Sequence, residues 1–162
     1  MPDLTSDGME KVLDRMRSLC SRREYCRSDI MKKAMKALDG DRVAAEKVVD
    51  ALVAEKYVDE IRYASAFVRD KSSLSGWGEA KIRYMLSSKG VPRDVVEIAL
   101  QEIDASKAGA RLERLMENKY RSLKDDPQCF LKMLRFGFGR GYDYEQIKFE
   151  YEKLQKTDIG RD

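Results

Sequence analysis

The sequence contains no histidine, and its three cysteines are Cys20, Cys26 and Cys129. The lack of histidine excludes a Ser-His-Asp triad, a Cys-His pair and every metal site that needs a histidine ligand. An odd number of cysteines without C-x-x-C spacing argues against a disulfide framework and against a zinc site. We therefore expect small, buried, reduced cysteines and no cofactor, which is typical of a cytoplasmic protein.

Long apolar runs are also missing. The first residues, "MPDLTSDGME", contain no apolar stretch, so we expect no signal peptide, and nothing later is long enough to cross a membrane. Hydrophobic residues make up 43% of the 162-residue chain and charged residues 38%, which favours a helical protein with charged outer faces. The net charge of +3 permits contact with nucleic acid or an acidic protein without requiring it.

Apolar residues recur at helical spacing along almost the whole chain, which predicts an all-α fold. The pattern indicates about nine helices in three tandem sets of three, over residues 8–57, 58–104 and 105–156. Sets of this size are typical of stacked helical repeats, which bury their apolar faces partly on each other. We therefore expect an elongated, curved arrangement of three-helix repeats and a monomeric chain.

Several polar residues predict where helices begin. Ser28 and Asp41 stand where N-caps of the second and third helices are expected, and Asp143 with Gln146 forms a capping-box pattern for the last helix.

A later stretch, Gly139–Tyr151, can be laid over Ser88–Leu100. The overlay pairs Lys89 with Arg140, Gly90 with Gly141, and Val91 with Tyr142. In both places a basic residue and a glycine precede an apolar or aromatic residue and a helix. We interpret each glycine as a helix stop in the left-handed conformation.

Two glycine clusters raise alternatives to this helical interpretation. Gly76 and Gly78 flank Trp77, but no strand-like run precedes them, so we interpret them as the start of a helix rather than a phosphate loop. The segment "LRFGFGRGYDY" (residues 134–144) alternates aromatic residues with glycine, which is also compatible with a β-hairpin.

The basic residues are the most informative candidates for a functional site, because no catalytic pair of carboxylates stands out and we expect no enzyme. If successive repeats present basic side chains on one side, they form a surface for nucleic-acid phosphates or an acidic protein groove. Ordinary solvated charges are the alternative, and Trp77 is either a packing anchor between repeats or an exposed contact. The candidate residues are Arg22, Arg23, Arg27, Lys71, Trp77, Lys81, Tyr84, Lys89, Arg135 and Arg140.

The stretch "KYVDEIRYASAFVRD…GWGEAKIRYMLSSKGVPRDVVEIAL" (residues 56–100) resembles the central repeat of the RecX family of regulatory proteins. The shared pattern is a tyrosine-apolar-acidic turn, an aromatic-Ala helix, a glycine-rich start, an Ile-x-x-x-Leu helix and a Lys-Gly-apolar stop. "SRREYCRSDIMKKAM" is similar to the first repeat of the family, and "GRGYDYEQI" to its third.

The resemblance implies a non-enzymatic regulator of the RecA recombinase, built of three three-helix repeats. Such proteins bind along the RecA–DNA filament, limit its growth or promote its disassembly, and some also bind DNA directly. A stand-alone DNA-binding module of the helix-turn-helix type remains the alternative.

Overall fold

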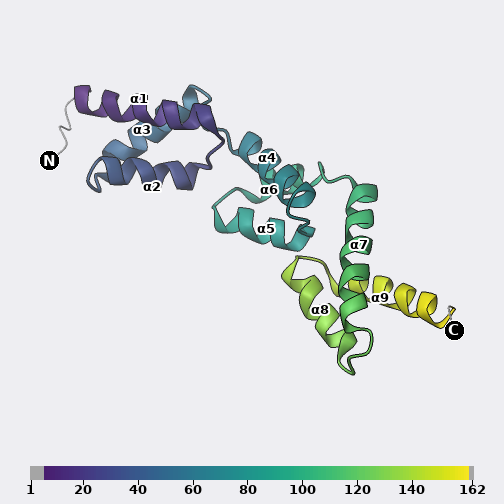
Figure 1. Cartoon of the computed structure of the whole chain (residues 1–162). Helices are drawn as coiled ribbons and strands as arrows, with labels where there is room; N and C mark the ends of the chain where they lie inside the picture. Colours follow the sequence, from purple (N-terminus) through teal and green to yellow (C-terminus); the bar gives the residue numbers. More distant parts are fainter. Residues whose placement is uncertain (1–5, 161–162) are drawn as a thin grey trace. The chain divides into compact units, whose positions relative to one another are not determined.

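The computed structural model describes residues 6–160, which contain α-helices and no strand (Figure 1). The all-α prediction is confirmed, and nine helices lie within this described range. They are α1 (Ser6–Arg22), α2 (Arg27–Ala37), α3 (Arg42–Ala54), α4 (Glu60–Ser73), α5 (Glu79–Ser88), α6 (Arg93–Leu100), α7 (Ala105–Leu123), α8 (Cys129–Gly139) and α9 (Tyr144–Ile159).

The chain forms two compact units. Among the described residues, the first consists of residues 6–67 with Leu86–Ala99, and the second of Val68–Met85 with residues 100–160. Both α4 and α5 therefore contribute residues to each unit. The predicted division into three sets of helices, and their elongated and curved arrangement, stay predictions.

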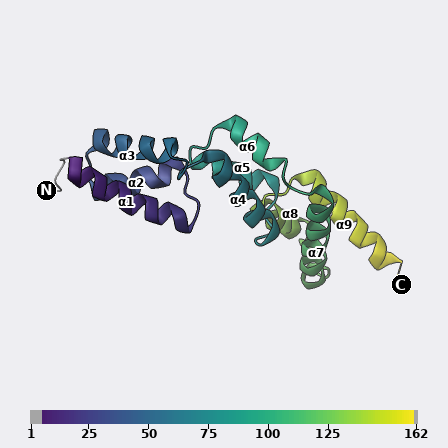
Figure 2. The ribbon, with the colours of Figure 1, turned by 90° about the horizontal axis from the view of Figure 1, so that it is seen from above.

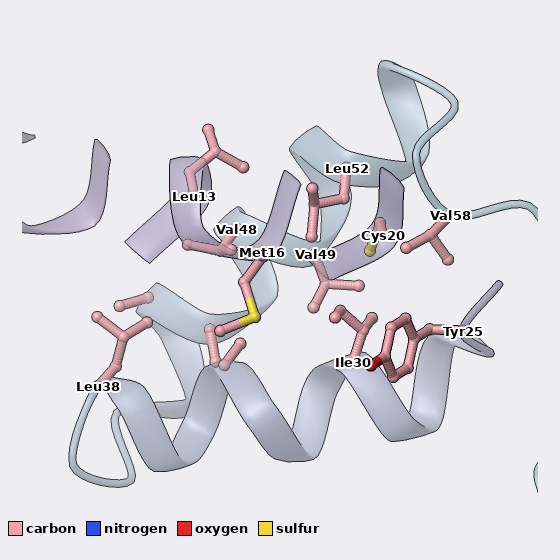
Figure 3. Close-up of a cluster of buried hydrophobic side chains, with 13 residues drawn as sticks. Leu13, Met16, Cys20, Tyr25, Ile30, Leu38, Val48, Val49, Leu52 and Val58 are labelled. Carbon is pink, nitrogen blue, oxygen red and sulfur yellow. The ribbon is translucent and has the colours of Figure 1, made fainter. Parts of the chain in front are cut away.

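In the first unit, α1, α2 and α3 pack against one another and lie side by side in both ribbon views (Figures 1 and 2). Their facing stripes enclose the side chains of Met16, Ile30, Val49 and Leu52, all at most 2% exposed (Figure 3). These positions follow the helical period, because residues three or four apart share one face of a helix. At the start of α3, the Asp41 carboxylate accepts a hydrogen bond from the Ala44 amide at 3.0 Å, which confirms this predicted N-cap.

In the second unit, α7, α8 and α9 pack together around Met116, Met133 and Ile147, which are fully buried. Gly137 on α8 lies so close to Ile147 that a Cβ atom at that position would overlap the isoleucine side chain. The glycine thus lets α8 and α9 approach each other. The aromatic-glycine segment forms the end of α8 and the turn to α9 rather than a β-hairpin. The Asp143–Gln146 capping box at the start of α9 is present as predicted.

The cysteine side chains are buried, and burial raises the pKa of each thiol. Cys26 is completely inaccessible, whereas Cys20 and Cys129 are 7% and 6% exposed. Thiols with a raised pKa react slowly, because the thiolate is the nucleophile.

Across residues 6–160, the structure contains no helix that is both long and apolar enough to span a membrane.

Candidate partner-binding surface

Lys89 links two distant parts of the first unit. Its ammonium group donates hydrogen bonds to both carboxylate oxygens of Asp29, at 3.1 and 3.0 Å. Its backbone carbonyl accepts a hydrogen bond from the Ser28 hydroxyl at 2.7 Å. The turn after α5 is therefore attached to the first residues of α2, about 60 positions earlier in the chain.

The ion pair between Lys89 and Asp29 is partly shielded from solvent, since the two side chains are 35% and 23% exposed. Burial raises the pKa of the Asp29 carboxyl, but the hydrogen bond from Lys89 and a further one from Cys26 outweigh this effect. The net pKa is below the usual value, so Asp29 is charged at neutral pH. Lys89 was predicted to face a partner, and in this structure its charge is engaged within the protein.

The predicted N-cap at Ser28 is wrong. The helix α2 begins one residue earlier, at Arg27, and its N-cap is Cys26, whose side chain makes no capping hydrogen bond to a backbone amide of the helix. The Ser28 hydroxyl donates to Lys89 instead, so a tertiary contact has replaced the local cap. The backbone amide of Arg27 finds its acceptor in the Glu60 carboxylate, at 2.6 Å.

Arg22, Arg23 and Arg27, here called the arginine cluster, lie exposed where α1 ends and α2 begins. The Arg23 guanidinium lies over the ring of Tyr25, with 4.5 Å between its carbon and the ring centroid. Arg27 forms an ion pair with Asp50 at 2.7 Å, and both of these side chains are about half exposed or more. The cluster is accessible to a partner, because an exposed pair of this kind holds its members only weakly.

The second unit contains the densest group of candidate residues. The segment Ser75–Lys81 lies against the turn Gly139–Tyr142, and we name these two segments together the glycine joint. The Gly78 amide donates to the Arg140 carbonyl at 2.6 Å, and the Ala80 amide donates to the Gly141 carbonyl at 3.2 Å. The glycine joint therefore includes direct backbone pairing between segments about 60 residues apart.

Glycine is required at two positions in the joint because the backbones approach closely. A Cβ atom on Gly78 would overlap the carbonyl group of Gly141, and a Cβ atom on Gly141 would overlap Lys81. Gly141 also has a φ of +94°, in the left-handed region that glycine adopts without strain. The structure thus confirms the predicted left-handed stop at Gly141, and Gly90 with a φ of +77° confirms the other.

Side chains reinforce the glycine joint. The Tyr142 hydroxyl donates to the Gly76 carbonyl at 2.9 Å, and the Arg140 guanidinium donates to the Ser75 carbonyl at 3.2 Å. The Lys81 ammonium donates to the Gly139 carbonyl at 3.1 Å. Burial raises the pKa of Tyr142 despite the opposing charges of two nearby arginines, so its hydroxyl remains a donor at neutral pH.

Trp77 is half-buried within the same joint. The ammonium groups of Lys71 and Lys81 lie 4.8 and 4.2 Å from its ring centroid. Two cations over one indole constitute a cation–π arrangement, which stabilises the lysines where they are. The structure favours the interpretation of Trp77 as a packing anchor, with its ring facing lysines of its own chain.

The candidate residues therefore fall into groups. Lys71, Trp77, Lys81 and Arg140 come together at the glycine joint, whereas Lys89 and the arginine cluster belong to the first unit. Tyr84 is 72% exposed on α5, whereas Ile82 and Leu86 of the same helix are fully buried. Arg135 is exposed on α8.

Lys89 and Arg140 occupy the paired positions of the sequence overlay, and their backbone contacts correspond as well. The Lys89 carbonyl accepts a hydrogen bond from Ser28, at the start of α2. The Arg140 carbonyl accepts one from Gly78, directly before α5. Each basic side chain also reaches a partner in that preceding segment, Asp29 or Ser75. Each unit thus contains a contact between one of these turns and the start of an earlier helix, although the donor is a side chain for Lys89 and a backbone amide for Arg140.

A basic cavity in the second unit brings Arg140 together with three basic residues, Lys107, Arg111 and Arg114, that are not among the predicted site residues. It has a volume of about 550 Å³ and lies between the segment Ser73–Gly76 and the helix α7. Its basic lining residues are Lys107, Arg111, Arg114 and Arg140. The sequence contains a signal for this group, because Arg111 follows Lys107 by four residues and Arg114 follows Arg111 by three. This spacing places all three side chains on one face of a helix.

The sequence model of a protein family described as "RecX, second three-helix domain" matches residues 59–100. A "Regulatory protein RecX" from Pseudomonas entomophila is 32% identical over 130 residues, which cover 80% of this chain and 82% of that protein. A second "Regulatory protein RecX", from Chromohalobacter salexigens, is 34% identical over 131 residues, which cover 80% of this chain and 84% of that protein. The chain belongs to the RecX family.

The length of RecX proteins varies among these relatives. The "Regulatory protein RecX" of Clostridium tetani is 29% identical over 122 residues, which cover 73% of this chain and 56% of that protein. The chain therefore spans only about half the length of the clostridial relatives that it matches.

Solved structures support the same fold. The crystal structure of RecX from Lactobacillus salivarius matches with a TM-score of 0.79 at 20% identity, covering 93% of this chain and 98% of that chain. A second crystal structure of a regulatory protein RecX also gives a TM-score of 0.79, at 21% identity over 89% of this chain. At such identity the likeness concerns the fold, and it places the chain among helical RecX structures.

Proposed function

We propose that this protein binds the RecA–DNA filament in the cytoplasm as a monomer and restrains recombinase activity without catalysing a reaction. The observation that carries the proposal is membership of the RecX family, whose relatives at 32–34% identity are named regulatory proteins. In this role the protein limits filament growth or promotes filament disassembly. Both effects reduce the strand exchange and coprotease functions of RecA.

The surface chemistry supports a role in binding. The arginine cluster is exposed in the first unit, and the second unit presents a basic cavity beside the glycine joint. Nucleic-acid phosphates and acidic side chains of a protein partner both attract such surfaces. Arginine is suited to these contacts because its planar guanidinium pairs with carboxylate or phosphate through two parallel hydrogen bonds.

The test follows ATP hydrolysis by RecA on single-stranded DNA while this protein is added. We expect hydrolysis to fall as the protein approaches stoichiometric amounts, because filament loss removes active ATPase sites. Electron microscopy of the same samples should show shorter or fewer filaments. Unchanged hydrolysis and unchanged filaments at stoichiometric protein would refute the proposal.

The alternative of a sequence-reading DNA-binding module gives a different result. Such a module would bind one duplex sequence far more tightly than others, because side chains of a recognition helix contact base edges. We expect no such preference here. Duplexes of random and selected sequence, titrated at several salt concentrations, distinguish the two functions, since strong selection of one sequence would favour the alternative.

A further inference from the structure

The basic cavity of the second unit lacks internal charge neutralisation. Its basic lining residues are Lys107, Arg111, Arg114 and Arg140, and none of the described residues that line it is acidic. The first unit contains a cavity of about 380 Å³ in which Arg27, Arg42 and Lys89 are accompanied by Glu46, Asp50 and Glu60. The two cavities thus differ in charge, and only that of the second unit is complementary to an anionic ligand.

The arginines of the basic cavity have N–H groups that form no hydrogen bond within the described part of the protein. Within residues 6–160, neither Arg111 nor Arg114 forms an ion pair or a side-chain hydrogen bond, and Arg114 is exposed. Arg140 donates one bond to the Ser75 carbonyl, and its guanidinium has other N–H groups left. The lining therefore offers several guanidinium donors to one anionic ligand of moderate size.

Apolar side chains distinguish this cavity from a simple phosphate site. Leu74 lines it and is 84% exposed, although exposure of a leucine side chain to water is unfavourable. Leu115 is half-buried beside it. No aromatic residue is among the described lining residues, so unpaired bases find no ring to stack on. The mixture of arginines and leucines is complementary to carboxylates that alternate with an apolar side chain.

We propose that the basic cavity binds an acidic peptide segment of a partner protein. Carboxylates of the segment pair with Arg111 and Arg114, and an apolar side chain of the segment packs on Leu74 and Leu115. This interaction goes beyond the proposed function, because it is defined by the chemistry of the segment and is tested without RecA.

The experiment measures fluorescence anisotropy of a labelled peptide in which leucines are set among glutamates, titrated with the full chain. A peptide with glutamine at each glutamate position and one with serine at each leucine position serve as ligand controls. A single-stranded DNA oligonucleotide is titrated in parallel. The glutamate–leucine peptide should bind, and either replacement should weaken binding by about tenfold or more, since each removes one set of contacts.

Matched protein variants locate the site. The double variant Lys107→Glu with Arg114→Glu reverses two exposed charges of the lining. The variant Arg121→Glu with Lys124→Glu makes the same charge change at exposed positions outside the cavity, one in α7 and one directly after it. We expect the first to lose peptide binding and the second to retain most of it. A third variant, Leu74→Ser, should weaken binding of the leucine peptide without changing the thermal midpoint.

The remaining outcomes contradict the proposal. Equal losses in both double variants would mean general electrostatic attraction, and the cavity would not be the site. Binding of the oligonucleotide alone, lost in Lys107→Glu with Arg114→Glu, would make the cavity a phosphate site and exclude an acidic peptide. Peptide binding by every variant with the affinity of the wild type would also overturn the proposal. None of these results depends on whether RecA is inhibited, so the proposed function stands or fails separately.

Discussion

The ammonium group of Lys89 holds both oxygens of the Asp29 carboxylate, at 3.1 and 3.0 Å. This contact connects the start of α2 with the turn that follows α5. It also gives the first unit a charge-dependent link, because only the ionised carboxylate accepts hydrogen bonds from lysine at both oxygens.

Replacing Asp29 with asparagine should lower the free energy of unfolding at pH 7. In the folded protein the pKa of Asp29 is below its usual value, which is about 3.9 in an unfolded chain. The ionised carboxylate therefore stabilises the fold fully at pH values above about 3.9. This stabilisation is lost as the pH falls through the lowered pKa. Urea midpoints of wild type and Asp29→Asn should therefore differ at pH 7 and converge in the acid range.

The control Asp50→Asn removes an exposed ion pair with Arg27, and it should change the urea midpoint little. A constant difference down to the acid limit would contradict this role for the charge.

Replacing Gly78 with alanine should destabilise the second unit by about 1–3 kcal/mol, because the added Cβ atom overlaps the Gly141 carbonyl. Gly109→Ala is the matched control. Gly109 lies in α7 with open space around it, so alanine there should stabilise by about 0.5–1 kcal/mol. Urea unfolding followed by the fluorescence of Trp77, which lies in the glycine joint, measures both variants. Equal effects of the two substitutions would mean that the close approach at Gly78 is not important for stability.

Leu86→Ala should cost about 2–5 kcal/mol of stability, because the Leu86 side chain is fully buried. Leu74→Ala removes the same atoms from a side chain that is 84% exposed, and should cost much less. Thermal or urea unfolding of the two variants makes the comparison. Similar losses at both positions would show that burial of Leu86 does not determine its contribution.

Replacing Arg22, Arg23 and Arg27 with alanine should weaken binding to the RecA–DNA filament and leave the thermal midpoint nearly unchanged. The structural contacts of the arginine cluster are an exposed ion pair and a cation–π contact, which contribute about 0–1 kcal/mol each. Co-sedimentation with filaments measures binding. A control with Lys36, Arg42 and Lys47 replaced by alanine makes the same charge change on exposed residues of α2 and α3. A large fall in the midpoint with retained binding would assign the cluster a structural role.

Helical periodicity alone was sufficient to predict the helices and their buried faces. Asp41 and the Asp143–Gln146 pair also cap helices as predicted, since a cap involves only residues within one turn. The overlay of Lys89 with Arg140 predicted two similar turns, and left-handed glycines follow both residues.

Contacts between distant segments were beyond such local patterns. Ser28 has the side chain of an N-cap, but its hydroxyl donates to Lys89, so a residue about 60 positions away changes its role. Lys89 was predicted to face a partner, and the structure pairs it with Asp29. The roles of these basic residues depend on which carboxylates or carbonyls reach them, which the sequence does not encode locally.

The sequence by itself determined the helices, their buried stripes and the family, because these depend on the identity and spacing of neighbouring residues. Only the tertiary structure decided which glycines allow close backbone contact and which cations are already paired. A Cβ atom on Gly78 would overlap another residue only because Gly141 lies against it, and Arg111 and Arg114 are available only because no described carboxylate pairs with them. The physical reason is that close packing and charge pairing are properties of distances between segments far apart in the chain.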